Sequence, residues 1–135
     1  MKSVVALLAA LLISLTCASC GSTHKKLDLP RDQIAQVRGV SSGFKLLGSS
    51  TSITFTEIDG KPTRDGVFSS APHVVDVTPG KHTFKVYYNV NYDTHSGPDG
   101  DAVVEIDAQA GKVYQLELSL DADRTRVLVS EVEGQ

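Results

Sequence analysis

The chain has very little cysteine: two of its 135 residues are cysteines, and both lie within the first twenty. Cys17 and Cys20 are three positions apart, and no thiol follows them in the sequence. A body without thiols excludes an internal disulfide, a cysteine nucleophile and a zinc–thiolate centre. The Cys-x-x-Cys pair would need a second pair of ligands to bind zinc, and no Cys or His pair follows at ligand spacing.

Basic clusters and helical periodicity are also missing. The chain has 13 basic and 16 acidic residues, a formal net charge of −3, and its longest basic run is Lys25-Lys26. Because a basic patch is absent from the sequence, we expect nucleic acid not to be a partner. After residue 30, no stretch combines apolar residues at i, i+3, i+4 and i+7 with capping residues, which argues against helices.

The amino terminus has the three parts of a secretory signal. Residues 1–3 carry one positive charge, residues 4–15 are almost wholly aliphatic, and small or polar residues lead to Cys20. This apolar run of twelve residues is shorter than the roughly 20 that span a bilayer. We therefore expect residues 1–19 to be a cleaved signal peptide that exports the chain.

The residues Ala18-Ser19-Cys20-Gly21 resemble the lipobox of bacterial lipoproteins. In that class the cysteine thiol receives a diacylglycerol group, so the resemblance implies a lipid at Cys20 and a tether over residues 20–33. The class prefers Leu three positions earlier, where this chain has Cys17, and Cys17 is the alternative attachment site. Gly21 resembles the residue found in lipoproteins of the outer membrane, which implies a location on its periplasmic face. Several acyl chains hold a protein durably, because each buried CH₂ contributes about 0.8 kcal/mol.

Beyond the tether, apolar and polar residues alternate with a period of two. In one such stretch Phe84, Val86 and Tyr88 alternate with polar or surface side chains, which predicts a strand. Strands are expected near residues 34–40, 52–58, 73–77, 81–92, 101–109, 112–120 and 124–132. Seven closely spaced strands predict an all-β domain over residues 34–135, a single antiparallel β-sandwich.

Turn residues mark where the chain reverses direction. Asp59-Gly60 ends one predicted strand, and Pro79-Gly80 suits the central positions of a tight turn. The turn at Pro79-Gly80 is expected to pair its flanking strands as a hairpin, with His73 and His82 far apart along the ladder. Ala110-Gly111 separates the next two strands at hairpin distance.

The same alternation predicts the core. The continuous apolar run 127–129 predicts a strand covered on both faces, whereas the serine-rich residues 41–52 are interpreted as a loop. Tyr92 is expected to share the core face of its strand with Tyr88. The inner faces are expected to hold Ile53, Phe55, Val75, Val77, Phe84, Val86, Tyr88, Ile106, Leu116 and Leu118.

Three segments carry a second resemblance: FTEIDGKPTRDG, VVDVTPGKHTFKVYY and EIDAQAGKVYQLEL. Their layout is similar to that of small bacterial surface domains of the PEGA kind and of uncharacterised lipoproteins with the same arrangement. The similarity spans residues 53–118. It implies a PEGA-like or transthyretin-like β-sandwich and transfers no catalytic residue, because its motifs consist of turn chemistry.

The polar residues 92–102 form the first candidate site. Asp93, Asp99 and Asp101, with His95, offer the hard oxygen ligands that calcium prefers, although their spacing is not that of an EF-hand. The alternative interpretation is a solvated hairpin loop whose Asp and Gly residues form turns.

Tyr87 is the second candidate. It lies between Lys85 and Asn89 on the polar face of its strand, where an exposed aromatic ring suits contact with a glycan or a protein. Tyr87 and His95 are thus the residues expected on a partner-binding surface. The alternative for Tyr87 is simple coverage of a cross-strand neighbour.

Taken together, these features predict a membrane-anchored envelope lipoprotein that acts as a non-catalytic binding or assembly module without a cofactor. Its partner would be an envelope protein or a cell-wall polymer. No G-x-S-x-G motif is present, and no histidine stands beside an activated serine. The alternative function is a small envelope hydrolase or an inhibitor of an envelope enzyme.

The lipid assignment is testable by replacing Cys20 with serine. Because the thiol is the acceptor, Cys20→Ser should yield an unprocessed or soluble chain that incorporates no labelled fatty acid. Normal lipid labelling of this variant would contradict the assignment and move the attachment to Cys17.

Overall fold

The computed structural model describes residues 27–44, 48–64, 69–121 and 124–133, with only the backbone for residues 41–44. The predicted signal peptide and both candidate lipid sites, Cys17 and Cys20, lie outside these residues. No helix among the described residues is both long enough and apolar enough to cross a membrane.

Most of the described chain is β-structure, which confirms the all-β prediction. One short 3₁₀ helix, η1 (Arg31–Gln33), precedes the strands. The strands are β1 (Ala35–Gly39), β2 (Ser41–Phe44), β3 (Ser49–Ile58), β4 (Lys61–Pro62), β5 (Val74–Val77), β6 (Gly80–Tyr92), β7 (His95–Ala108), β8 (Val113–Asp121) and β9 (Arg124–Val132). Seven of them fall where strands were expected, and β4 is additional. β2 and the start of β3 lie in residues 41–52, so the interpretation of that segment as a loop is wrong.

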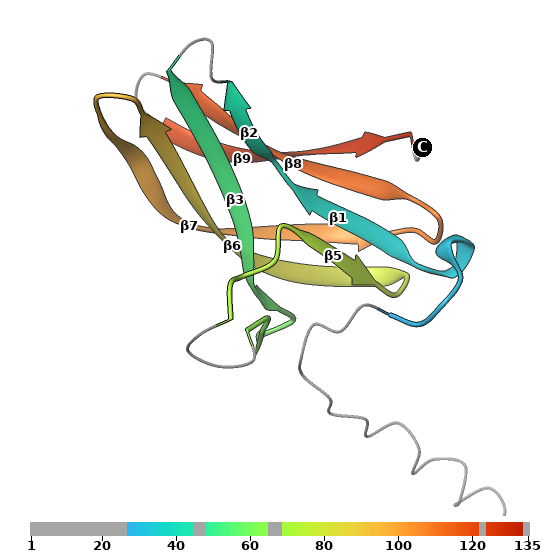
Figure 1. Cartoon of the computed structure of the whole chain (residues 1–135). Coiled ribbons are helices and arrows are strands. Elements are labelled where there is room, and N and C mark those ends of the chain that lie inside the picture. The colour runs from blue at the N-terminus through green and yellow to red at the C-terminus, as the bar shows by residue number, and fades with distance from the viewer. Residues whose placement is uncertain (1–26, 45–47, 65–68, 122–123, 134–135) are drawn as a thin grey trace, which may run out of the picture.

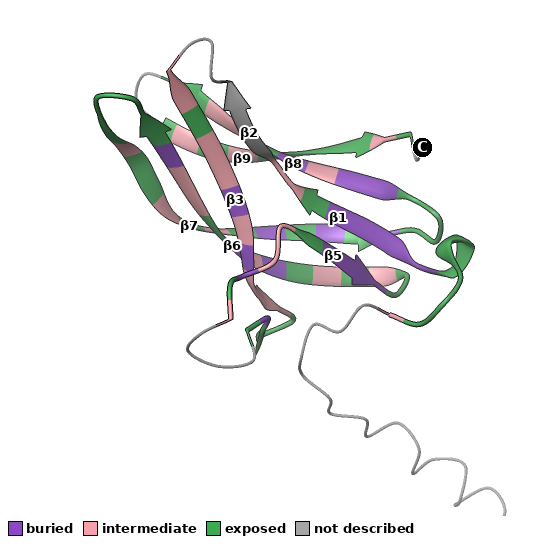
Figure 2. Cartoon of the chain, viewed as in Figure 1, coloured by how far each residue is buried: buried purple, intermediate pink, exposed green. Residues whose placement is uncertain are grey.

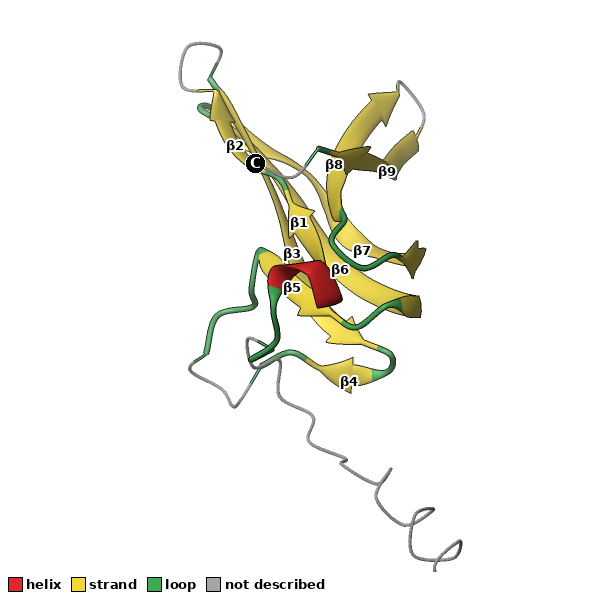
Figure 3. Cartoon of the chain, turned by 90° about the vertical axis from the view of Figure 1, so that its right-hand side faces the viewer, coloured by secondary structure: helices red, strands yellow, loops and turns green. Residues whose placement is uncertain are grey.

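The strands form two sheets that face each other (Figures 1 and 3). Sheet A has the order β5-β1-β8-β9, and sheet B has the order β2-β3-β6-β7 with β4 added beside β3. All neighbours are antiparallel except β1 and β8, which run parallel with Val37 opposite Tyr114. The prediction of a purely antiparallel sandwich is therefore wrong at this one pair.

Two predicted hairpins are instead crossings between the sheets. Pro79-Gly80 joins β5 of sheet A to β6 of sheet B, and Ala110-Gly111 joins β7 of sheet B to β8 of sheet A. The turn residues correctly indicated chain reversal, but reversal does not require the flanking strands to share hydrogen bonds. By contrast, Asp59-Gly60 does close a hairpin between β3 and β4, and the positive φ angles of 51° and 75° match a type I′ turn.

Because Pro79-Gly80 joins two sheets, His73 and His82 do not lie along one hairpin ladder as expected. His73 lies beside β3, where its Nδ1 atom is 2.9 Å from the backbone oxygen of Ile53. His82 has acceptors at both ring nitrogens: Nδ1 is 2.7 Å from Asp59 Oδ2, and Nε2 is 2.7 Å from the backbone oxygen of Thr78. Through these two contacts the His82 ring joins the crossing at Thr78 to the β3–β4 turn at Asp59.

Asp59 is the acceptor that completes this arrangement. Partial burial opposes its ionisation, but hydrogen bonds from the Thr83 backbone N–H and from His82 outweigh burial and lower the pKa of Asp59. A lowered carboxyl pKa contributes stability that is present above the unfolded-state pKa and is lost as pH falls through the folded-state pKa.

One side of the sandwich is closed by the backbone. The Val40 oxygen, just after β1, accepts a hydrogen bond from Ile53 of sheet B at 2.9 Å, while Val40 N donates to Leu116 of sheet A at 3.2 Å. Gly39 allows this approach, because a Cβ atom there would overlap the backbone oxygen of Ile53. Pro72 and His73 accept further bonds from Phe55 of sheet B and Gly39 of sheet A.

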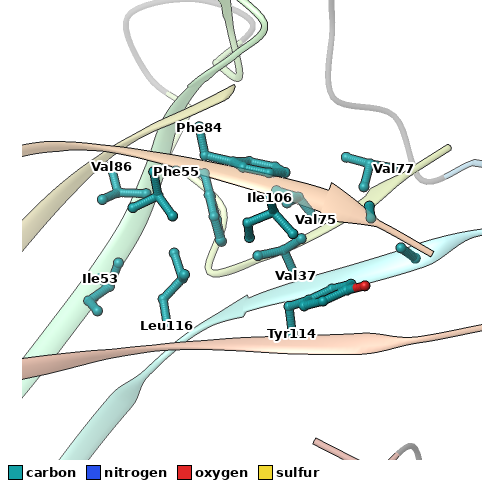
Figure 4. Packing of buried hydrophobic residues seen from close by; sticks show 13 residues of the cluster. Val37, Ile53, Phe55, Val75, Val77, Phe84, Val86, Ile106, Tyr114 and Leu116 are labelled. Atoms are coloured by element: carbon teal, nitrogen blue, oxygen red, sulfur yellow. The ribbon is translucent and has the colours of Figure 1, made fainter. Parts of the chain in front are cut away.

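The core lies between the sheets and draws residues from both (Figure 4). Of the ten predicted inner residues, eight are buried, while Tyr88 and Leu118 are partly buried against them. Phe55 and Phe84 make an edge-to-face contact at its centre, with ring centroids 5.7 Å apart. The alternation therefore identified the core correctly, because side chains of period two reach one face of a sheet.

Two burial predictions are wrong. Tyr92 is 37% exposed, because it lies at the tip of the β6–β7 hairpin beyond the opposing sheet's core residues. Residues 127–129 are not covered on both faces, since Leu128 and Val129 are 52% and 42% exposed. β9 is an edge strand of sheet A, and most of it is exposed (Figure 2).

The central aromatic pair gives a stability prediction. Phe55→Ala should lower the free energy of unfolding by about 3–5 kcal/mol, because it removes a fully buried ring and leaves a cavity. Val103→Ala, at a side chain 67% exposed, should change it by no more than about 0.5 kcal/mol. Denaturant unfolding of both variants measures the difference, and equal losses would contradict the described core.

Candidate functional site

Tyr87 lies on the outward face of sheet B, as predicted, but it has a specific partner. Its hydroxyl donates a hydrogen bond of 2.9 Å to Asp99 Oδ2, and Asp101 lies directly opposite it on β7. This hydrogen bond, with some desolvation and the negative charge of Asp99, raises the pKa of Tyr87 above its ordinary value. The phenol is therefore held neutral and oriented along the sheet.

A shallow hollow lies beside the Tyr87 ring. Thr56, Pro62, Arg64 and Asp101 line it together with Tyr87. The β3–β4 hairpin forms one wall, and its chain is fixed by Thr63, whose hydroxyl donates to the Phe55 backbone oxygen at 2.5 Å. An aromatic ring beside one cation and one carboxylate can contact a polar surface, but no group here is arranged as a nucleophile with a base.

His95 lies apart from Tyr87. Its ring stacks on Tyr92 at a centroid distance of 4.8 Å, and Thr94 Oγ1 is 3.0 Å from His95 Nδ1. Tyr92 and His95 pair at the hairpin tip, five positions along β6 from Tyr87, which corresponds to about 17 Å of strand. The two predicted contact residues are thus not brought into one site.

Most of the predicted 92–102 loop is strand. The turn contains only Asp93 and Thr94, and β7 begins at His95, with a bulge opposite residues 89–91. The polar composition misled the loop interpretation, because both strands of a protruding hairpin tip meet water and carry polar side chains.

The three aspartates considered for calcium take different positions. Asp93 lies at the turn, where its backbone N–H donates to the Gly48 oxygen, whereas Asp99 and Asp101 lie on β7 opposite Asn89 and Tyr87. Within the described ranges, no group of three or more His, Cys, Asp or Glu side chains could hold a metal ion.

The feature that the sequence interpretation missed is the exposed β9 edge. Leu128 projects from the outer face of sheet A, opposite Glu117, and Val129 projects from the inner face, opposite Leu116. β9 pairs with β8 on one side only, so its other side is a row of backbone donors and acceptors that no strand of the described chain pairs with, although β7 of sheet B comes near it. Three consecutive apolar residues occur in edge strands and in central strands alike. The run 127–129 therefore could not show that β9 is an edge strand.

Comparisons of the chain with protein-family models, with curated proteins and with solved structures gave no match.

The Tyr87–Asp99 contact predicts a measurable titration. In Asp99→Asn the pKa of Tyr87 should fall toward its ordinary value of 10.0, because the charged acceptor that favours the neutral phenol is lost. Because folding raises the pKa of Tyr87, the contact stabilises the fold at pH values below the ordinary pKa of tyrosine. This contribution is lost as pH rises through the pKa of folded Tyr87. Site-resolved NMR titration of the tyrosine rings measures the shift.

Asp107→Asn is the matched control, since Asp107 is also exposed on β7 but lies opposite Lys81. An unchanged Tyr87 titration in Asp99→Asn, or an equal change in both variants, would contradict the contact.

Proposed function

We propose that the chain is an exported lipoprotein, anchored through Cys20, whose β-domain acts without catalysis as an assembly module of the cell envelope. The anchor is supported by the signal-like residues 1–19 and the small residues around Cys20. The assembly role rests on one observation: β9 is a nine-residue edge strand with exposed apolar side chains at its centre. Such an edge is a template for pairing with a strand of another molecule.

The other sheet edges differ from β9 in ways that discourage pairing. β5 and β2 have only four residues each. β7 is longer, but Pro98 lacks a backbone donor, and a bulge irregularity interrupts the β6–β7 register. β7 also carries the exposed acidic residues Asp99, Asp101, Glu105 and Asp107. Short length, proline, bulges and charge are the features by which proteins protect free edges.

The partner that fits β9 is a second copy of the same strand. β9 begins with Arg124 and Arg126 and ends near Glu131 and Glu133. Antiparallel pairing about Leu128 places Arg126 opposite Ser130 and Arg124 opposite Val132 of the other copy, so no like charges stand directly opposite one another. A two-fold axis at Leu128 makes the contact self-complementary and keeps the apolar centres in register.

This pairing would extend sheet A across both molecules. Each copy supplies main-chain hydrogen bonds along the edge, and the exposed Leu128 side chains cover one another on the outer face. Because both copies would be held at a membrane, their effective concentration is raised, which favours a contact of modest area.

For the finer fold class, we propose a PEGA-like or transthyretin-like sandwich. The support is the sequence resemblance over residues 53–118 together with the two facing sheets, in which the Asp59-Gly60 motif forms a hairpin turn. Motifs that form turns, such as Asp59-Gly60, are typical of a β-sandwich that exposes its sheet edges and loops to other molecules.

The dimer is testable by cysteine cross-linking of the full chain. In antiparallel pairing about Leu128, the two Leu128 Cα atoms would lie about 4.5–5.5 Å apart. That spacing suits a disulfide, so Leu128→Cys should give a cross-linked dimer under mild oxidation. Non-reducing electrophoresis of the membrane-held protein measures it.

Leu120→Cys is the matched control, because Leu120 is similarly exposed, at 47%, but lies on β8. It should cross-link no more than the unmodified chain. Equal cross-linking of both variants, or a Leu128→Cys chain that stays monomeric under oxidation, would overturn self-pairing. A mixed disulfide between the Leu128→Cys chain and another envelope protein would also overturn it and would assign the edge to that partner instead.

A further inference from the structure

A small pocket lies where the tether meets the fold. η1 and the turn before β8 enclose a hollow of about 220 Å³ on the outer face of sheet A. Its lining includes the side chains of Arg31, Gln36, Arg38 and Lys112 and the backbone at Gly111. We call this the basic pocket.

A buried polar network forms the floor of the basic pocket. Asp76 Oδ1 accepts hydrogen bonds from Gln36 Nε2 at 3.1 Å and from Arg31 Nη1 at 3.4 Å. Gln36 Oε1 in turn accepts from Arg38 Nε at 2.7 Å. Gln36 and Asp76 are only 7% and 8% exposed, so the network holds the stems of two otherwise mobile arginines in fixed directions.

The network leaves donors free for a ligand. Arg38 uses its Nε atom, and its two terminal nitrogens have no partner within the described part of the chain. The Arg31 guanidinium bonds through one nitrogen, and its side chain is 65% exposed. A guanidinium presents a planar fork of donors, which matches the oxygens of a phosphate or carboxylate.

The charged side chains that line the basic pocket are all cations, although the chain as a whole is negative. Arg31, Arg38 and Lys112 line it, and no carboxylate does. Asp76 bonds to Arg31, and Lys112 is balanced by Glu131, whose Oε1 atom lies 2.6 Å from its Nζ atom, and by the nearby charge of Glu133. Arg38 bonds only to the neutral Gln36 side chain among the described residues, so its charge favours an anion at this place.

We propose that the basic pocket binds a phosphate group carried on a small polar molecule. Three cations that approach from η1, β1 and the β7–β8 turn surround a tetrahedral oxyanion better than a flat carboxylate, which offers two oxygens. The hollow has roughly seven times the volume of a water molecule in the liquid, which is about 30 Å³, and so it has room for the group attached to the phosphate.

The position of the basic pocket indicates where this phosphate comes from. Arg31 follows Cys20 by eleven residues, a span of at most about 40 Å when fully extended. If Cys20 carries a lipid, as the proposed function requires, the basic pocket can reach the headgroup layer. An anionic phospholipid headgroup is then the nearest phosphate, and a free phosphate compound is the other source of the same chemistry.

Arginine footprinting of the full chain tests the proposal. Phenylglyoxal modifies accessible guanidinium groups, and mass spectrometry resolves the rate at each arginine. One arm adds inorganic phosphate to the protein in neutral detergent. The other arm compares phosphatidylcholine vesicles with vesicles that also contain phosphatidylglycerol. Arg124 and Arg126, exposed on β9, are internal controls.

Binding should slow modification of Arg31 and Arg38 but not of the two control arginines. At a phosphate concentration about ten times the Kd, occupancy would slow the reaction about elevenfold. Protection by phosphatidylglycerol identifies a lipid headgroup, whereas protection by inorganic phosphate alone identifies a free phosphate compound. No selective protection in either arm would overturn the proposal. A chain that lacks the lipid still reports on the basic pocket in the detergent arm, so the two proposals fail separately.

Arg38→Gln should abolish the protection of Arg31, and a cooperative melting transition shows that the fold survives the loss of the bond from Arg38 to Gln36. Arg126→Gln is the matched variant and should retain the protection. Retention in both variants would show that Arg38 does not contribute to the basic pocket.

Discussion

The pairing of β1 on both of its edges is the constraint on which the rest of the structure depends. β5 bonds to it in antiparallel fashion and β8 in parallel fashion, so three distant segments meet at five residues. Ala35 and Val37 point into the core, whereas Gln36 points outward into the network with Asp76. One strand therefore fixes the order of sheet A, one wall of the core and the floor of the basic pocket.

The sequence located seven of the nine described strands but did not assign their partners. The side chains of a pleated strand alternate between the two faces of its sheet. The alternation around Phe84 and Val86 therefore indicates both that the segment is a strand and which side chains face the core. Sheet membership depends on contacts between segments far apart in the sequence, and the residues Pro79-Gly80 are the same whether they close a hairpin or join two sheets. The parallel β1–β8 pair has no local signal, because it joins segments about 75 residues apart.

For the candidate sites too, the sequence predicted what depends on local pattern but not what depends on pairing between distant segments. The outward direction of Tyr87 was predictable from the period of two, but its bond to Asp99 required the register of β6 against β7. Arg31, Arg38 and Lys112 come together only because η1, β1 and the β7–β8 turn converge. Leu128 is exposed because it lies on the outer face of an edge strand, and the residues 127–129 themselves do not indicate that position.

The passage of backbone through Gly39 and Val40 makes the two sides of the sandwich mechanically unequal. On that side the sheets share main-chain hydrogen bonds and cannot separate without breaking them. On the far side, β7 and β9 are the outermost strands of their sheets and lie near each other, and no main-chain hydrogen bond is found between them in the described residues. Thermal fluctuation should therefore open the sheets about the Gly39 side as a hinge, and amide hydrogen exchange should be fastest along the β7 and β9 margin.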